Sequence, residues 1–221
     1  MNTNDYDRIF NIKKLHARNS KRDKNLLAFE KAHEIRKLEI DLYWRRTAYF
    51  WTLIAALFAG YFLLASKASD TSLKHNNTYL IFISMTGYVF SLGWFLVNKG
   101  SKFWQENWEF HIDKLEDNIT GPLYKTVLHR ENKGDGKKDI IKRVFSPGSF
   151  SVSKINQFIA AYTTLLWVAL MITSIDGICS LLFSTTSTWC ITYFMYKKTR
   201  SEIKDHSEPM QIRATERKTI L

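Results

Sequence analysis

The stretch "TAYFWTLIAALFAGYFLLAS" (Thr47–Ser66) decides the fold, because none of its 20 residues is charged. A helix rises about 1.5 Å per residue, so a run of this length crosses the roughly 30 Å hydrocarbon core of a bilayer. The mean hydropathy of −0.23 hides this character because other parts of the chain are strongly polar. We predict an all-α membrane protein with four transmembrane helices. The other three predicted spans are Thr78–Asn98, Ile155–Ile175 and Gly177–Tyr196.

The polar segments between the spans carry further structural signals. Residues 22–46 contain no Gly or Pro and many good helix formers, which predicts a helix that continues into the first span. Lys102–Asp117 follows the second span and predicts an amphipathic helix, which Pro122 should terminate. Ser153 is predicted to cap the third span. The β-branched segments 123–129 and 139–145 flank the turn-rich 130–138, which predicts a small β-hairpin.

The predicted organisation has five parts, and the distribution of positive charge gives their orientation. Lys and Arg number 12 in residues 1–46, 2 in 67–77, 11 in 99–154 and 7 in 197–221. Cytoplasmic segments of membrane proteins hold the excess of Lys and Arg, so both termini and the middle segment should be cytoplasmic. The five parts are a cytoplasmic N-terminal region (1–46), transmembrane helices 1 and 2 (47–98), a cytoplasmic middle segment (99–154), a transmembrane helical hairpin (155–196) and a cytoplasmic tail (197–221).

The net charge of +11 is better explained by lipid than by nucleic acid. Basic side chains beside a span attract anionic headgroups, at about 1 kcal/mol each near the surface. No nucleic-acid-binding motif is present in the sequence. The predicted headgroup anchors lie next to Tyr and Trp at the cytoplasmic interface, and they are Arg45, Arg46, Lys197, Lys198 and Arg200.

Catalytic and metal chemistry find little support in the sequence. Glu106, Glu109, His111 and Asp113 are close in sequence, but His111 is two residues from its nearest carboxylates and therefore lies well around the helix from both. Glu109 and Asp113 could pair for acid–base work, yet no nucleophile or phosphate loop accompanies them. We predict a solvated acidic face, with no metal, cofactor or enzymatic activity. The spans contain no charged residue or His, which argues against proton-coupled transport.

Several stripes predict contacts between helices. Small residues favour close approach of helices in a membrane, and they occur at Ser84, Gly87 and Ser91 and at Ala55 and Ala59. A polar stripe on the fourth span, spaced by four residues, would either pack against protein or line a pore. Its members are Ser180, Ser184, Thr188 and Thr192. An apolar stripe in the middle segment predicts an oligomer seam, with a basic helix such as 22–46 as its mate. This stripe consists of Trp104, Trp108, Ile112, Leu115 and Ile119.

Three blocks resemble a known family. They are "FEKAHEIRKLEIDLYWRRTAYFWTLIAALFAGYF", "WQENWEFHIDKLEDNITGPLYKTVL" and "FSVSKINQFIA". The residue pattern of these blocks and their order along the chain resemble the RipA family of octameric bacterial inner-membrane proteins, over about residues 29 to 196. The resemblance implies a homo-octamer in a bacterial inner membrane. The resemblance assigns no catalytic role to any residue of this chain.

The sequence therefore favours a homo-oligomeric inner-membrane protein with a structural, sensory or scaffolding role, assembled through cytoplasmic helices. It could also recruit a cytoplasmic protein partner. The alternative is a multimeric channel with a Ser/Thr-lined pore. A membrane-bound enzyme is a third, weaker hypothesis.

Overall fold

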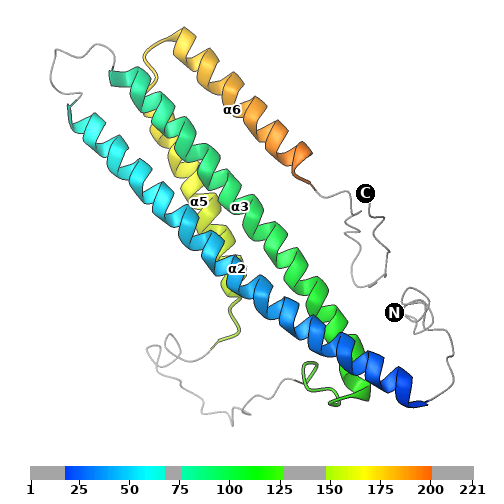
Figure 1. Cartoon of the computed structure of the whole chain (residues 1–221). Coiled ribbons are helices and arrows are strands. Elements are labelled where there is room, and N and C mark those ends of the chain that lie inside the picture. Colours follow the sequence, from blue (N-terminus) through cyan, green and yellow to red (C-terminus); the bar gives the residue numbers. More distant parts are fainter. Residues whose placement is uncertain (1–17, 68–75, 127–147, 201–221) are drawn as a thin grey trace, which may run out of the picture.

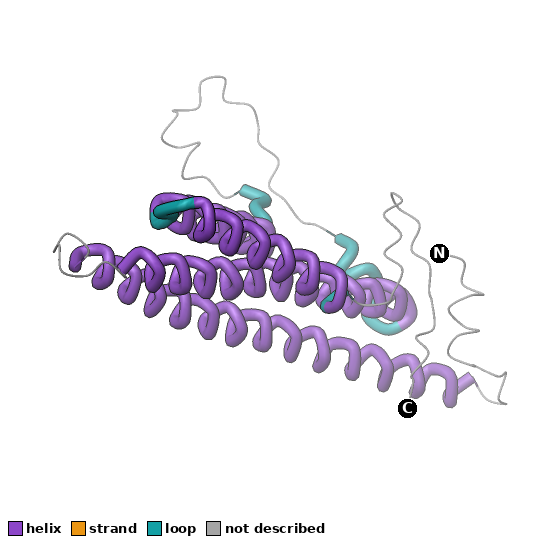
Figure 2. Tube along the Cα trace, turned by 90° about the horizontal axis from the view of Figure 1, so that it is seen from above, coloured by secondary structure: helices purple, strands orange, loops and turns teal. Residues whose placement is uncertain are grey.

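The computed structural model of the chain describes residues 18–67, 76–126 and 148–200, and these residues are helical apart from short connections. The long helices run side by side (Figures 1 and 2), and a short 3₁₀ helix follows the end of one of them. They are α2 (Arg18–Lys67), α3 (Asn76–Leu115), η1 (Glu116–Asn118), α5 (Val152–Thr173) and α6 (Ile178–Lys198).

All four long helices are long and apolar enough to cross a membrane. No strand occurs among the described residues. The predicted β-hairpin lies almost entirely in residues 127–147, which are outside the described residues, and 123–125 form a turn.

Helices α2 and α3 are much longer than a membrane is thick. The 50 residues of α2 make a rod of about 75 Å, and the 40 residues of α3 make one of about 60 Å. One helix thus covers both residues 22–46 and the first predicted span. Helix α3 likewise continues through Gly100 into the amphipathic stretch. The two helices extend together beyond the start of α5 (Figure 1). We call this pair, residues 24–46 of α2 and 99–115 of α3, the stalk.

Helix α5 packs closely on α3 because α3 presents small side chains there. Ser84, Gly87 and Ser91 are all buried, and Trp167 of α5 lies directly over Gly87. The indole of Trp167 also stacks on Phe58 of α2, with ring centroids 4.2 Å apart. The predicted close contact is therefore confirmed at Gly87, and Ser84 and Ser91 are buried on the same helix. The two alanines predicted for the same role, Ala55 and Ala59, lie exposed on α2 among the described residues.

The N-cap of α5 differs from the prediction. Ser151, not Ser153, caps the helix, since its Oγ accepts a hydrogen bond of 3.4 Å from the backbone N–H of Lys154. Ser151 has the extended backbone that an N-cap needs, whereas Ser153 already lies in the first turn. The Oγ of Ser153 accepts a hydrogen bond from Nε2 of Gln157 instead. The prediction was wrong by two residues because both positions carry serine.

A tight turn, residues 174–177, joins α5 to α6 and is held from two sides. Tyr61 of α2 lies within 3.3 Å of the Ser174 hydroxyl, and Asn77 of α3 donates to the Asp176 carboxylate. These contacts fix the α5–α6 hairpin against the other helices. Helix α6 contacts α3 but leaves large side chains exposed, among them Trp189 and Phe194.

Candidate functional site

The stalk has its own small apolar core. Phe29 and Ala32 of α2 are buried against Ile112 and Leu115 of α3, and Trp108 packs beside them. Ile119, just after η1, closes the same cluster. Most of the stripe predicted as an oligomer seam therefore contacts α2 of the same chain, which is the basic helix named as its mate. Trp104 is half-buried. Contact of this stripe with another copy stays a prediction.

Charged side chains join the two helices along the edge of this core. The Arg36 guanidinium donates twice to Oε1 of Glu109, over 3.1 and 3.3 Å. Lys102 lies 3.7 Å from the same carboxylate and 3.4 Å from Glu106. The Arg36 guanidinium also lies 5.9 Å from the ring centroid of Tyr124. Arg36 thus ties α2 both to α3 and to the turn that follows η1.

Two groups of the stalk have shifted pKa values. Desolvation by burial raises the pKa of Asp113 above its usual 3.8, and the neighbouring carboxylate of Glu116 adds to the effect. Burial alone lowers the pKa of His111. Among the described residues, no three His, Cys, Asp or Glu side chains come together as a metal site. The carboxylates Glu106, Glu109 and Asp113 instead belong to the charged surface of the stalk.

Glu116 is a buried carboxylate in the stretch Lys102–Asp117, for which the sequence predicted a solvated acidic face. Its side chain is fully buried and accepts hydrogen bonds from the backbone N–H groups of Tyr124, at 2.7 Å, and Lys125, at 3.3 Å. This contact requires the chain to turn back, and Gly121 allows it by adopting a φ of 74°. The signal in the sequence was the Gly-Pro pair after the helix, which marks a turn without showing which side chain the turn meets.

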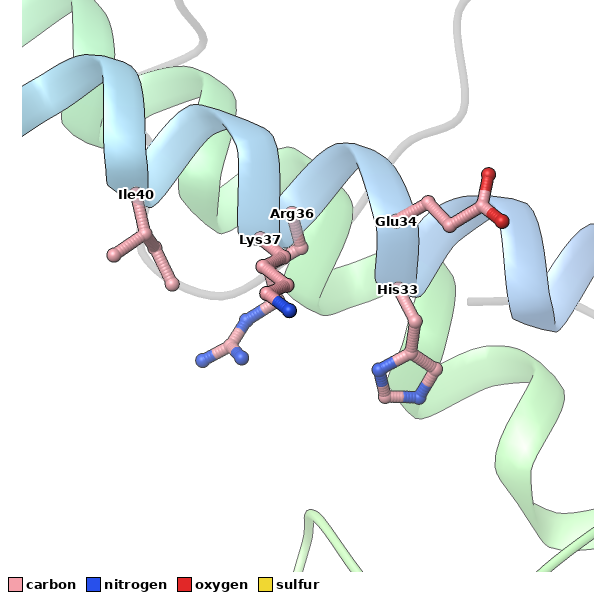
Figure 3. Close-up of a pocket in the computed structure, with 5 residues that line it drawn as sticks. All are labelled: His33, Glu34, Arg36, Lys37 and Ile40. Atoms are coloured by element: carbon pink, nitrogen blue, oxygen red, sulfur yellow. The ribbon is translucent and has the colours of Figure 1, made fainter.

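An open pocket of about 420 Å³ lies on the stalk, lined by five residues of α2 that include Arg36. Figure 3 shows that His33, Arg36 and Lys37 point to one side of the helix, whereas Glu34 points away. Arg36 is already paired with Glu109, and Nδ1 of His33 lies 3.3 Å from the Tyr124 hydroxyl. The pocket is therefore a gap between tied side chains, and its lining contains no carboxylate and nucleophile arranged for catalysis.

A polar cluster marks the level at which the stalk meets the spans. Asn156 of α5 is buried, and its Nδ2 donates to the Tyr43 hydroxyl at 2.7 Å and to Oγ1 of Thr47 at 3.2 Å. Both partners are buried residues of α2. The sequence offered no signal for this cluster, because a single Asn near the start of a span predicts neither its orientation nor its partners.

The predicted headgroup anchors have different surroundings. Arg46 is held in the stalk by the Ser101 hydroxyl, at 3.0 Å, and Arg45 pairs with Asp41 one turn away, at 2.9 Å. Lys197 donates to the Tyr193 hydroxyl at 2.7 Å. Lys198 and Arg200 are exposed at the end of α6. Contact of these five residues with lipid stays a prediction.

The predicted polar stripe of α6 contacts its own chain at several points. Ser184 is fully buried, Thr188 donates to Sδ of Met171, and the hydroxyls of Thr192 and Tyr88 share a hydrogen bond. Ser180 bonds to the backbone of Gly177 at the start of the helix. These contacts hold α6 against α3 and α5. A pore lined by the stripe stays a prediction.

Comparison with known proteins supports the resemblance to an octameric family. The model of the octameric membrane protein family (8xMP) matches residues 26–175, which is more than half of the 221 residues. The matched part includes the first three spans and all of the stalk except residues 24 and 25, and it ends just before α6. Neither a curated protein nor a solved structure matches the chain significantly. The family match confirms the predicted octameric family without carrying the name RipA. The chain therefore belongs to the octameric membrane protein family (8xMP).

Proposed function

We propose that this chain is a subunit of a homo-octameric scaffold in a bacterial inner membrane. Its role is structural or sensory, and it presents the stalk to the cytoplasm, where a cytoplasmic protein partner can bind. The stalk is the observation that carries the proposal. It has its own buried core and an ion pair between Arg36 and Glu109 that joins its two helices. The turn at its end is held by the hydrogen bond from the Tyr124 N–H to Glu116, so the stalk keeps its shape outside the spans.

Charge and family membership support the same assignment. Thirty of the 32 Lys and Arg residues lie in the three segments assigned to the cytoplasm, which include both helices of the stalk. The matching family is described as octameric. The proposal includes no catalytic step. Glu106 and Glu109 are paired with Lys102 and Arg36, and Glu116 accepts from backbone N–H groups.

Mass and labelling measurements test this function. Native mass spectrometry of the protein in lipid nanodiscs should give eight copies, and a monomer at all protein concentrations would overturn the proposal. For orientation, Lys24→Cys and Lys67→Cys are made in a chain whose Cys179 and Cys190 are replaced by serine. A membrane-impermeant maleimide added to intact spheroplasts should label Lys67→Cys at once, and Lys24→Cys only after permeabilisation. The reverse labelling would overturn the cytoplasmic assignment.

A multimeric channel is the second candidate, and the Ser/Thr stripe of α6 is the observation that favours it. The contacts of Ser184, Thr188 and Thr192 within the chain favour packing instead. Reconstitution into planar bilayers separates the two readings. Currents that change when Thr188 is replaced by a bulkier residue would establish the channel. The absence of currents, with octamers verified in the same preparation, would rule out the channel.

A further inference from the structure

The stalk exposes an apolar face on α2 that is distinct from its contact with α3. Leu27 and Leu38 are 58% and 53% exposed, and Ile35 and Leu42 lie half-buried on the same side of the helix. We call these four residues the Leu face. Phe29 and Ala32, which meet α3, lie on a different side of α2. The Leu face is therefore not used by the helical pair itself.

A second exposed apolar face lies on α3. Phe103 and Phe110 are 39% and 46% exposed, and they are seven residues apart, so they share one side of the helix. We call this pair the Phe face. Ile112 and Leu115, which meet α2, point elsewhere. The stalk thus carries two different apolar faces, one on each helix.

These faces extend beyond the reach of the bilayer. Leu38 is nine residues before Thr47, or about 13 Å along the helix, and Leu27 is about 30 Å away. Phe110 is twelve residues after Asn98, or about 18 Å. The interfacial layer outside the hydrocarbon core is only about 5–8 Å thick on each side. Apolar side chains this far out face water in a single chain, and clustered exposure of this kind marks a protein contact.

The symmetry of a membrane oligomer requires two different faces. Copies inserted with the same orientation can be related only by rotation about the membrane normal. A closed ring of eight copies then uses a heterologous interface, in which one surface of each copy meets a different surface of the next. Two unlike apolar faces on the stalk satisfy this requirement.

The two faces also match in height. Arg36 pairs with Glu109, and Arg46 bonds to Ser101, which fixes the antiparallel register of the helices. In this register Ile35 lies level with Phe110 and Leu42 lies level with Phe103. Rotation about an axis along the stalk preserves height, so the Leu face of one copy meets the Phe face of its neighbour at the same level.

The charges around the faces are complementary. Lys24, Lys31 and Arg45 lie on the side of α2 that carries the Leu face, and Glu34 borders it. Three acids, Glu106, Asp113 and Asp117, border the Phe face, together with Lys99 and Lys114. Glu106 and Asp117 form surface pairs with Lys102 and Lys125 of the same chain. The exposed pairs of Lys31 with Glu34 and of Arg45 with Asp41 are worth little in water, so these cations can turn to a neighbour. Opposite net charge favours contact between unlike faces over contact between like faces.

We infer that the Leu face of one stalk packs on the Phe face of the next copy, closing the ring in the cytoplasm. This inference rests on the proposed homo-octamer and names its interface. The occupant of each face is a second copy of this chain.

Cross-linking tests the pairing directly. Leu38→Cys and Phe110→Cys are made singly and together in the full chain, with Cys179 and Cys190 replaced by serine, and treated with a short bismaleimide in native membranes. The double variant should give a ladder of bands up to eight copies. Each single variant alone should give none, and the two single variants expressed together should give dimers only. Self-cross-linking of Leu38→Cys, or an uncross-linked double variant whose octamer is intact, would overturn the inference.

Substitution gives a second, independent readout. Leu38→Glu and Phe110→Glu should each lower the octamer fraction at least tenfold in native mass spectrometry. Leu26→Glu is the matched control, because Leu26 is an exposed leucine of α2 about a third of a turn round the helix from Leu38. It should leave the octamer unchanged. An intact octamer in both test variants would assign the faces to lipid or to another protein and overturn the inference. A wild-type monomer would instead overturn the proposed function itself.

Discussion

The indole of Trp167 occupies the space where a side chain on Gly87 would be. A Cβ built on Gly87 would lie 2.2 Å from Cε2 of Trp167, a distance that no real contact tolerates. The ring is clamped on its other side by Phe58. Helix α5 can therefore approach α3 only while residue 87 is glycine.

Gly87→Ala should destabilise the helical bundle by about 1–3 kcal/mol, because the extra methyl group overpacks the contact. Gly60→Ala is the control, since its Cβ would make an ordinary contact of 3.8 Å with Ile83. That change should be neutral or stabilise by up to about 1 kcal/mol through helix propensity. Thermal unfolding in detergent, followed by tryptophan fluorescence, measures both. Equal melting temperatures for the two variants would contradict the packing described.

Glu116→Ala should loosen the turn after η1. The variant removes the buried carboxylate to which the backbone N–H groups of Tyr124 and Lys125 donate, and a hydrogen bond to a charged group contributes about 1.5–3 kcal/mol. Hydrogen exchange of these two amides should become faster, while that of α2 residues 50–60 stays unchanged. Asp117→Ala removes an exposed carboxylate that accepts from Nζ of Lys125, so it controls for loss of negative charge beside the turn. Unchanged protection of Tyr124 in Glu116→Ala would contradict the role of Glu116.

Asp113→Asn should raise stability at neutral pH. The folded protein raises the pKa of Asp113 above the ordinary 3.8, so ionisation of this carboxyl opposes folding. The favourable contribution of the group is present below the unfolded pKa and is lost as pH rises through the folded pKa. The melting temperature of the variant should therefore exceed that of wild type at pH 7, and the difference should shrink toward pH 4. A difference in melting temperature that grows on acidification would contradict the raised pKa of Asp113.

Asn156 and Tyr43 should be energetically coupled. Asn156→Ala and Tyr43→Phe each remove one partner of the 2.7 Å hydrogen bond, and a double-mutant cycle should give a coupling of about 0.5–1.5 kcal/mol. Tyr49→Phe is the matched control, because Tyr49 is exposed on the same helix. It should be additive with Asn156→Ala. Additivity in both cycles would remove the hydrogen bond as a contributor to stability.

Composition predicted the spans because crossing a membrane requires only length and apolarity. Thr47–Ser66 and Thr78–Asn98 fall inside α2 and α3, and the third and fourth runs coincide with α5 and α6 except at residues 174, 175 and 177, which form the turn between them. Periodicity identified the apolar stripe at Trp108 and Ile112, and helix propensity indicated the continuous α2. These features depend on residues close together in the sequence, and such patterns are read most reliably from sequence.

The contacts between distant segments could not be predicted in the same way. Glu116 looked like one acid of a polar face, since its partners depend on the path of the chain beyond Gly121. Ala55 and Gly87 looked equally suited to close packing, but only Gly87 faces α5. Ser151 and Ser153 were equivalent as caps until the backbone chose between them. In each case local chemistry allowed the contact, and the tertiary arrangement decided it.

The unbroken course of α2 has a mechanical consequence. A helix without a hinge between Leu27 and Thr47 acts as a lever about 30 Å long that is anchored at the bilayer surface. A tilt of about 5° in the membrane would displace its far end by about 3 Å, which is comparable to the small helix shifts that accompany allosteric transitions at subunit interfaces. Changes of lipid thickness or tension would in this way be converted into sideways movement at the far end of the stalk.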